Sequence, residues 1–133
     1  MLIAALVAVG SCGGGTATQP EPSPPGLLTP ADAAVLDNGC LDGSDPLVWE
    51  FDWSDVPGAT GYELYVRQFT STAPAIDASD VTTSSYRREA MGYVGPVNLE
   101  GWEWRVRAQV DGAYQDWSAT RRFSVEPLDS DCS

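Results

Sequence analysis

The chain has 133 residues, which is enough for one domain and not for two. Its net charge of −12 argues against nucleic acid as a partner and against contact between the folded part and an anionic membrane. The sequence contains no histidine, and all seven cationic residues are arginine, so histidine bases, histidine metal ligands and lysine Schiff bases are excluded.

Residues 1–11 form an uncharged apolar run. The run is too short to span a bilayer, which needs about 20 residues, but it fits the hydrophobic region of a signal peptide. The positively charged segment that should precede it is missing. We therefore expect a truncated or misassigned start and interpret residues 1–11 as a signal peptide.

The end of this run, Val9-Gly10-Ser11-Cys12, resembles the lipobox of bacterial lipoproteins. The resemblance implies cleavage before Cys12 and a covalent diacylglycerol on its thiol, with no other cofactor. It also implies an outer-membrane location if the host is Gram-negative, because Gly13 rather than aspartate follows. An ordinary signal peptide with a chance cysteine is the alternative.

Residues 13–26 contain four prolines, four glycines and a single charge. Such a segment cannot bury apolar surface and favours an extended or disordered chain. Its 14 residues could reach about 45 Å when fully extended. We therefore divide the chain into a signal peptide (1–11), a lipidated cysteine with its tether (12–26) and a folded domain (27–133).

Apolar and polar residues alternate along several segments of that domain. The alternation predicts strands at 47–53, 61–67, 102–110 and about 119–126, and weaker strands at 27–36 and 81–89. Pro30 places the first of these at a sheet edge, and Asp111-Gly112 is typical of a hairpin turn. The inward-facing residues form the predicted core: Trp49, Phe51, Trp53, Tyr62, Leu64, Val66, Trp102, Trp104, Val106, Ala108 and Phe123.

About seven short strands over 100 residues, with frequent turns, predict an all-β, antiparallel, immunoglobulin-like sandwich of two sheets. The residues Trp53, Tyr62-Glu63-Leu64-Tyr65-Val66 and Trp102-Glu103-Trp104-Arg105-Val106-Arg107-Ala108 resemble the fibronectin type III family. The resemblance implies that Trp53 is the buried strand B tryptophan, that Tyr62 opens strand C and that 102–108 is strand F. Trp102 stands where the family has the tyrosine of its tyrosine corner.

The chain has three cysteines. With Cys12 lipidated, Cys40 and Cys132 remain as a pair in an oxidising compartment, which predicts a disulfide that stabilises the domain by about 4–5 kcal/mol. In a sandwich of the resembled family, the loop that holds Cys40 lies at the same end as the chain after the last strand, so the topology agrees with this pairing.

Arg105 and Arg107 point outward from the predicted strand F, and the segment Tyr114 to Ser118 runs beside it. This pattern resembles the Trp-Ser-x-Trp-Ser segment of cytokine-receptor type III domains, where arginines stack on aromatic rings. It predicts a stack of Arg105, Arg107, Tyr114 and Trp117, with cation–π contacts of about 0.5–2 kcal/mol each. An exposed aromatic binding ridge is the alternative.

The acidic residues of the sequence do not indicate a metal site or an active site. Asp37, Asp42 and Asp45 lie in a glycine-containing loop, but their spacing does not match an EF-hand, so we expect neither calcium nor another metal. No motif singles out a carboxylate pair for glycoside hydrolysis. We therefore predict a protein that is not an enzyme.

The sequence thus favours a non-catalytic cell-envelope lipoprotein whose sandwich binds or spaces an envelope or extracellular protein or glycan. Only the lipid anchor would contact the membrane. Loops 54–59 and 111–116 would face it, and the Cys40 loop, 68–75 and 90–101 would form the distal, binding end. One alternative is a carbohydrate-binding domain with a coplanar row of Tyr65, Tyr93 and Tyr114, and another is a structural subunit of an envelope complex.

Overall fold

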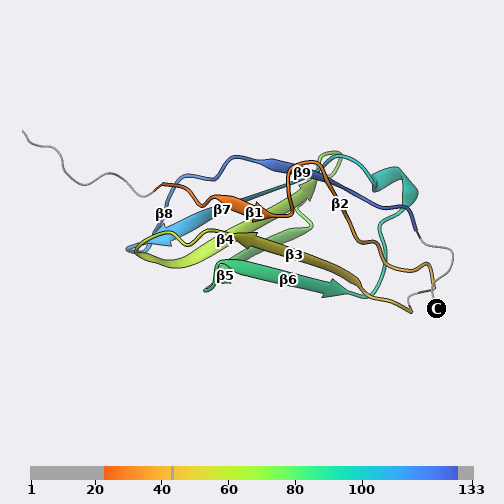
Figure 1. The fold of residues 1–133 in the computed structure, drawn as a ribbon, viewed down its shortest axis with the longest axis horizontal. Coiled ribbons are helices and arrows are strands. Elements are labelled where there is room, and N and C mark those ends of the chain that lie inside the picture. Colours follow the sequence, from red (N-terminus) through yellow and green to blue (C-terminus); the bar gives the residue numbers. More distant parts are fainter. Residues whose placement is uncertain (1–22, 43, 129–133) are drawn as a thin grey trace, which may run out of the picture.

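The computed structural model describes residues 23–42 and 44–128, which form two packed β-sheets (Figure 1). A short 3₁₀-helix covers Pro96–Asn98. The strands in the described residues are β1 (Leu27–Thr29), β2 (Ala34–Leu36), β3 (Leu47–Trp53), β4 (Ala59–Gln68), β5 (Ile76–Val81), β6 (Ser85–Ala90), β7 (Trp102–Val110), β8 (Ala113–Tyr114) and β9 (Arg121–Val125).

The smaller sheet has the strand order β1-β3-β6, and the larger sheet has the order β2-β9-β7-β4-β5, with β8 paired to β7. The all-β sandwich that the alternation predicted is therefore confirmed. The prediction of seven strands in wholly antiparallel sheets was wrong, because nine strands form in the described part of the chain and β2 pairs with β9 in parallel.

The extra strand and the parallel pair arise at Pro30, where the first predicted strand splits. Proline has no amide proton for the ladder, so β1 ends before it and the chain crosses from the smaller sheet to the larger one. Arg121 holds this crossover, since its Nη1 donates to the carbonyls of Leu28 at 2.9 Å and Pro30 at 3.0 Å. β1 and β2, the two halves of the predicted strand, both lie at sheet edges, where a proline interruption is tolerated.

The predicted edge strand at 81–89 corresponds to β6, and a further strand, β5, forms just before it in residues for which, apart from Val81, no strand was predicted. β5 pairs with β4 in the larger sheet, whereas β6 pairs with β3 in the smaller sheet. The chain changes sheets at residues 82–84, and the amide of Trp53 donates to the carbonyl of Ser84 at 3.0 Å. The strands on either side of this turn belong to two different layers.

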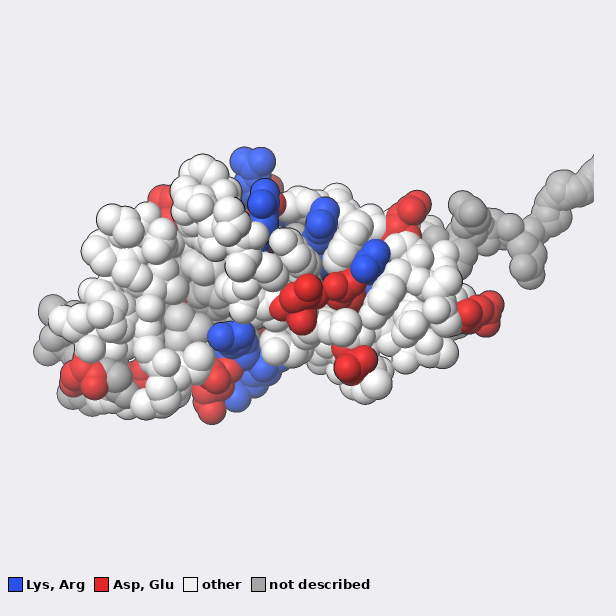
Figure 2. Space-filling view, turned by 180° about the vertical axis from the view of Figure 1, so that it is seen from behind, with Lys and Arg blue, Asp and Glu red and all other residues white. Residues whose placement is uncertain are grey.

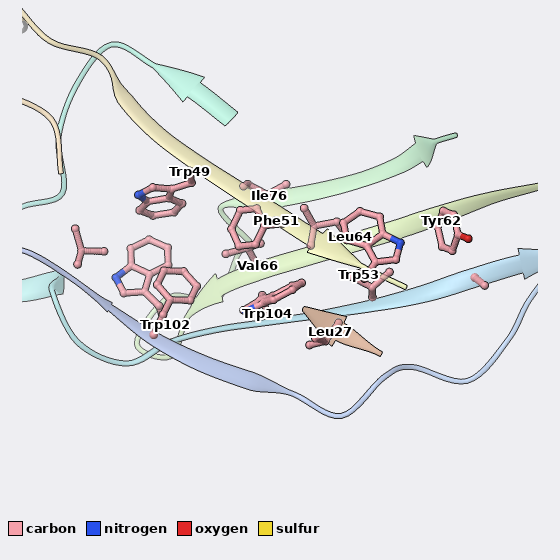
Figure 3. Close-up of a cluster of buried hydrophobic side chains, with 14 of the residues drawn as sticks. Leu27, Trp49, Phe51, Trp53, Tyr62, Leu64, Val66, Ile76, Trp102 and Trp104 are labelled. Atoms are coloured by element: carbon pink, nitrogen blue, oxygen red, sulfur yellow. The ribbon is translucent and has the colours of Figure 1, made fainter. Parts of the chain in front are cut away.

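The core lies between the two sheets, and all eleven residues expected there are buried. Trp49, Phe51 and Trp53 project from β3 toward β4 and β7 (Figure 3). The ring centres of Phe51 and Trp104 lie 5.1 Å apart, and those of Trp53 and Tyr62 lie 5.6 Å apart. The aromatic rings therefore interlock across the layers at the distances that favour edge-to-face contact.

A tryptophan takes over the role of the tyrosine corner. Trp102, the first residue of β7, donates from Nε1 to the carbonyl of Asn98 at 2.6 Å. The hydrogen bond runs back four residues to the segment that approaches the strand, as the corner tyrosine does in immunoglobulin-like domains. The substitution at this position therefore preserves the link between β7 and the segment before it.

The two ends of the sandwich are defined by contacts between distant segments. At one end, the amide of Gly26 donates to Ser54 Oγ at 2.8 Å, so the start of the described chain lies beside the turn after β3. The β7–β8 turn lies at the same end in Figure 1. Asp111 and Gly112 have φ values of 52° and 80°, as a tight hairpin turn requires.

At the opposite end, which we call the distal end, the segments around Asn38, Val94 and Glu126 meet. The described chain thus enters at one end of the long axis and leaves β9 at the other (Figure 1).

Replacing Trp53 by alanine should lower the free energy of unfolding by about 3–5 kcal/mol, because the side chain is 1% exposed and its loss leaves a large cavity. Urea unfolding followed by circular dichroism measures this change. Val97→Ala is the control, since Val97 is 87% exposed and should change stability by less than about 0.5 kcal/mol. A loss below about 1 kcal/mol for Trp53→Ala would show that the packing of β3 is wrongly described.

Candidate binding surfaces on the sheet face and at the distal end

Two arginines and three aromatic rings form a continuous stack on the outer face of the larger sheet. The Arg105 guanidinium carbon lies 5.2 Å from the ring centre of Tyr65 and 4.4 Å from that of Trp117. The Arg107 guanidinium carbon lies 4.4 Å from the ring centre of Trp117 and 4.2 Å from that of Tyr114. We call this series, from Tyr65 to Tyr114, the arginine–aromatic ladder. It brings together all four residues for which the sequence predicted a stack and adds Tyr65.

Strand register explains why the ladder forms. Tyr65 of β4 lies directly opposite Arg105 of β7, and Glu63 lies opposite Arg107. Cross-strand partners have neighbouring β-carbons, so their side chains meet without further adjustment. The ion pair between Glu63 Oε1 and Arg107 Nη2 measures 2.6 Å and fixes the guanidinium between its two rings.

Glu63, which pairs with Arg107 of the ladder, has a shifted pKa. Burial raises the pKa of its carboxyl above the ordinary value, and a hydrogen bond with the Asp77 carboxyl raises it further. Arg107 acts in the opposite direction. Because a carboxyl with a raised pKa binds more protons in the folded state, this group makes folding less favourable as the pH rises through the shifted range.

Most groups of the ladder that could contact a ligand already contact one another or the backbone. Tyr65 and Trp117 are half-buried against the arginines, and the Tyr114 hydroxyl donates to the carbonyl of Ser79 at 3.0 Å. Arg105 Nε is buried and has no hydrogen-bond partner within the described residues. The geometry therefore favours the structural interpretation of this stack over an exposed binding ridge.

The coplanar row of Tyr65, Tyr93 and Tyr114 does not exist. Tyr65 and Tyr114 belong to the ladder, whereas Tyr93 lies near the distal end, in the segment that leads to the 3₁₀-helix. The three tyrosines come from different elements that the sandwich separates, and this separation could not be seen from their spacing in the sequence.

A buried asparagine organises the distal end. Asn38 Nδ2 donates to the carbonyls of Val94 at 3.0 Å and Glu126 at 2.9 Å, and its Oδ1 accepts from the amides of Gly39 and Val94 at 2.8 Å. One side chain thus ties together three segments, since Asn38 lies 56 residues from Val94 and 88 residues from Glu126 along the chain.

Two glycines permit the same close packing. A β-carbon on Gly39 would lie 1.8 Å from the carbonyl oxygen of Gly92. A β-carbon on Gly101 would lie 1.9 Å from the ring of Phe69, and the φ of +83° at Gly101 also favours glycine.

Two adjoining hollows lie beside this junction, and together we call them the distal groove. The larger has a volume of about 510 Å³ and the smaller about 280 Å³. Both are lined by Ala75, Tyr93, Val94 and Trp102, which form the boundary between them. A volume of 510 Å³ lies in the range typical of small-molecule sites.

Exposed apolar side chains gather around the distal groove. Met91 is 71% exposed, Tyr93 48% and Val97 87%, all within the connection between β6 and β7. In Figure 2 the part of the surface away from the N-terminal end is largely uncharged, whereas acidic and basic side chains are mixed across the middle of the molecule. Large exposed apolar side chains that cluster in this way are typical of interaction sites.

The sequence pointed to the loops 68–75 and 90–101 but not to the polar residues that shape them. Asn38 and Gln68 are buried, at 7% and 6% exposure, although neither lies in a motif. In the sequence, Asn38 is a polar residue beside a glycine, and Gln68 is a polar residue at the end of an apolar strand. Such residues are too common to identify a site.

None of the predicted cysteine and acidic site residues that the structure describes lines the distal groove. Cys40 is buried at the distal end, while Cys12 and Cys132 lie outside the described residues, so the disulfide and the lipid anchor stay predictions. Asp37, Asp42 and Asp45 belong to no group of three metal-binding side chains among the described residues. The amide of Ser44 donates to Asp42 and lowers the pKa of that carboxyl.

No family model matches the sequence, and the comparison with curated proteins gives no match. A solved Fn3-like protein from Clostridium thermocellum has 23% sequence identity, covers 81% of this chain and 97% of its own, and gives a TM-score of 0.49. The fibronectin type-III domain of human fibronectin type III domain containing protein 3 has 18% identity, covers 91% of this chain and 99% of its own, and gives a TM-score of 0.45.

The sandwich itself contains the elements that the sequence resemblance implied. β3 carries the buried Trp53 and β7 contains the alternating segment 102–108, as the resemblance implied, whereas β4 begins at Ala59, three residues before the Tyr62 that was expected to open it. Within residues 23–42 and 44–128, no helix is long and apolar enough to cross a membrane.

The stack of Arg107 on Trp117 should be measurable as a coupling energy. We expect a double-mutant cycle with Arg107→Met and Trp117→Leu to give about 0.5–2 kcal/mol in urea unfolding. The matched control pairs Trp117→Leu with Arg87→Met, because Arg87 lies on β6 and forms an exposed ion pair with Glu89. The control cycle should give less than about 0.5 kcal/mol, and equal values in both cycles would contradict the ladder.

Proposed function

We propose that the protein is a membrane-tethered, non-catalytic binding module of the cell envelope, and that its distal groove contacts an envelope or extracellular ligand. The lipidated Cys12 would hold the chain at the membrane, and residues 13–26 would separate the domain from it. The sandwich would then act as a rigid spacer that presents the groove.

One observation carries this proposal: the point where the tether joins the domain and the distal groove lie at opposite ends of the sandwich. Gly26 is hydrogen-bonded to Ser54 at one end. The groove is lined by Tyr93 and Val94, and the connection between β6 and β7 that contains them lies at the other end (Figure 1). A domain anchored through Gly26 therefore points the groove away from the anchor.

The composition of the groove supports binding without covalent chemistry. Its two hollows contain no carboxylate, thiol or imidazole among the described residues that line them. Arg88, the cationic residue there, donates from Nη1 to the carbonyl of Ala75 at 3.2 Å. A ligand in this groove would meet aromatic, apolar, hydroxyl and amide groups and this one guanidinium, which contact a ligand but are poor proton carriers at neutral pH.

The anchor can be tested by metabolic labelling. Cells that express the chain and grow with an alkyne-bearing fatty acid should yield a labelled protein in the membrane fraction. Cys12→Ser should abolish the label and release the protein from that fraction, whereas Cys40→Ser should keep both. Retention of the label in Cys12→Ser would exclude the lipobox.

The direction of binding can be tested by photo-crosslinking in intact cells. p-Benzoylphenylalanine in place of Val97, at the rim of the distal end, should capture an envelope or extracellular protein or glycan. The same group in place of Asp55, which is exposed at the tether end, should capture much less. Equal capture at both positions, or capture only at residue 55, would overturn the proposed orientation.

A further inference from the structure

We propose that the ligand of the distal groove is an uncharged oligosaccharide that carries acetamido groups. This inference rests on the proposed function and specifies the class of ligand. It follows from the chemistry of the two hollows, from the fixed position of their walls and from the charge of the domain.

The larger hollow has no charged residue in its wall, although a fifth of the chain is charged. Its polar side chains are the amides and hydroxyls of Gln68, Thr70, Ser71, Asn98 and Tyr93. Gln68, Thr70 and Ser71 make hydrogen bonds within the chain, so Asn98 and Tyr93 are the uncharged side chains of this wall that remain to bond the hydroxyl groups of a neutral sugar. An ionised sugar in this hollow would lose part of its hydration without gaining an opposite charge, because the cationic residue of the groove, Arg88, lines the smaller hollow and donates there to the carbonyl of Ala75.

Tyr93 supplies the flat apolar surface that a sugar ring requires. Its side chain is 48% exposed and lines both hollows, with the largely buried ring of Trp102 beside it. One face of a pyranose ring exposes mainly C–H groups, which pack on an aromatic ring, while the tyrosine hydroxyl remains available for a hydrogen bond.

The smaller hollow accounts for the acetamido group. Leu47, Ile76 and Met91 give it an apolar wall next to Tyr93. A sugar with hydroxyls alone would place polar groups against this wall, whereas an acetamido methyl group would bury apolar surface there. The junction of a polar and an apolar hollow at one aromatic ring therefore fits an N-acetylhexosamine better than an unsubstituted hexose.

The walls are held in place before a ligand arrives. Gln68 Nε2 donates to the carbonyl of Glu100 at 2.8 Å, and its Oε1 accepts from the amide of Thr70 at 2.9 Å and from the Thr70 hydroxyl. The carbonyl of Asn98 accepts from Trp102, while its side-chain amide makes no hydrogen bond within the described residues. That amide is therefore available to a ligand, and the preformed walls reduce the entropy cost of binding.

The net charge of the chain also favours an uncharged ligand. A net charge of −12 repels polyanions, so acidic polysaccharides are poor candidates for this groove. An uncharged chain meets no such barrier.

Isothermal titration calorimetry tests the inference on the full chain carrying Cys12→Ser, which keeps it unlipidated. The probes are triacetylchitotriose, cellotriose and trigalacturonic acid. We expect triacetylchitotriose to bind at least about tenfold more tightly than the other two. Tyr93→Ala should weaken its binding by about tenfold, as loss of an aromatic platform predicts, while Tyr93→Phe should change it less than threefold (about 0.6 kcal/mol).

Tyr114→Ala is the matched control, because Tyr114 is an exposed tyrosine of the ladder and does not line the groove. This variant should bind like the parent, and all variants should keep the parent's far-ultraviolet circular dichroism. Absence of triacetylchitotriose binding, equal binding of trigalacturonic acid, or binding that survives Tyr93→Ala would overturn the saccharide inference. Capture of a protein by residue 97 in cells, without saccharide binding, would overturn it and leave the proposed binding module in place.

Discussion

The structure depends on aromatic side chains that alternate along β3 and β7 and interlock between two sheets. Trp49, Phe51 and Trp53 face Trp102 and Trp104 across a layer that water does not enter. Side chains in a strand point to alternate faces, so each of these strands gives every second residue to the core and the others to the outside. The interior is filled, and contact with a partner is restricted to the outer faces, the edges and the two ends.

The outer face of the larger sheet is mostly occupied by its own contacts. Glu63 neutralises Arg107, and Arg105 and Arg107 lie against the ring of Trp117. A partner on this face would have to compete with contacts that register has already placed at close range. The distal end differs, because its loops expose apolar side chains around a hollow whose polar residues are fixed from behind.

Strands with strict alternation could be predicted from the sequence, because burial on one face imposes period two on the residues themselves. β3 and β7 are of this kind. β5 could not be predicted, because its side chains are mostly small or acidic and Ile76 is the buried one among them, and because the change of sheet at residues 82–84 depends on which neighbour each strand finds. The ladder could be predicted because Arg105 and Arg107 alternate on β7, and the segment that contains Trp117 follows the β7–β8 hairpin and runs back beside β7. The distal groove could not, because Asn38, Gln68 and Tyr93 come together only through contacts between remote segments.

The remote contacts also explain why a loop region can serve as a binding surface here. Loops usually lose conformational freedom when they bind, and that loss weakens affinity. At the distal end, Asn38 joins three segments, and Gly39 and Gly101 allow backbone and ring to approach more closely than any larger residue would permit. These loops are therefore ordered during folding. The free energy of packing the tryptophans offsets the conformational entropy that this ordering costs. A ligand then needs only to fill a groove that already has its shape.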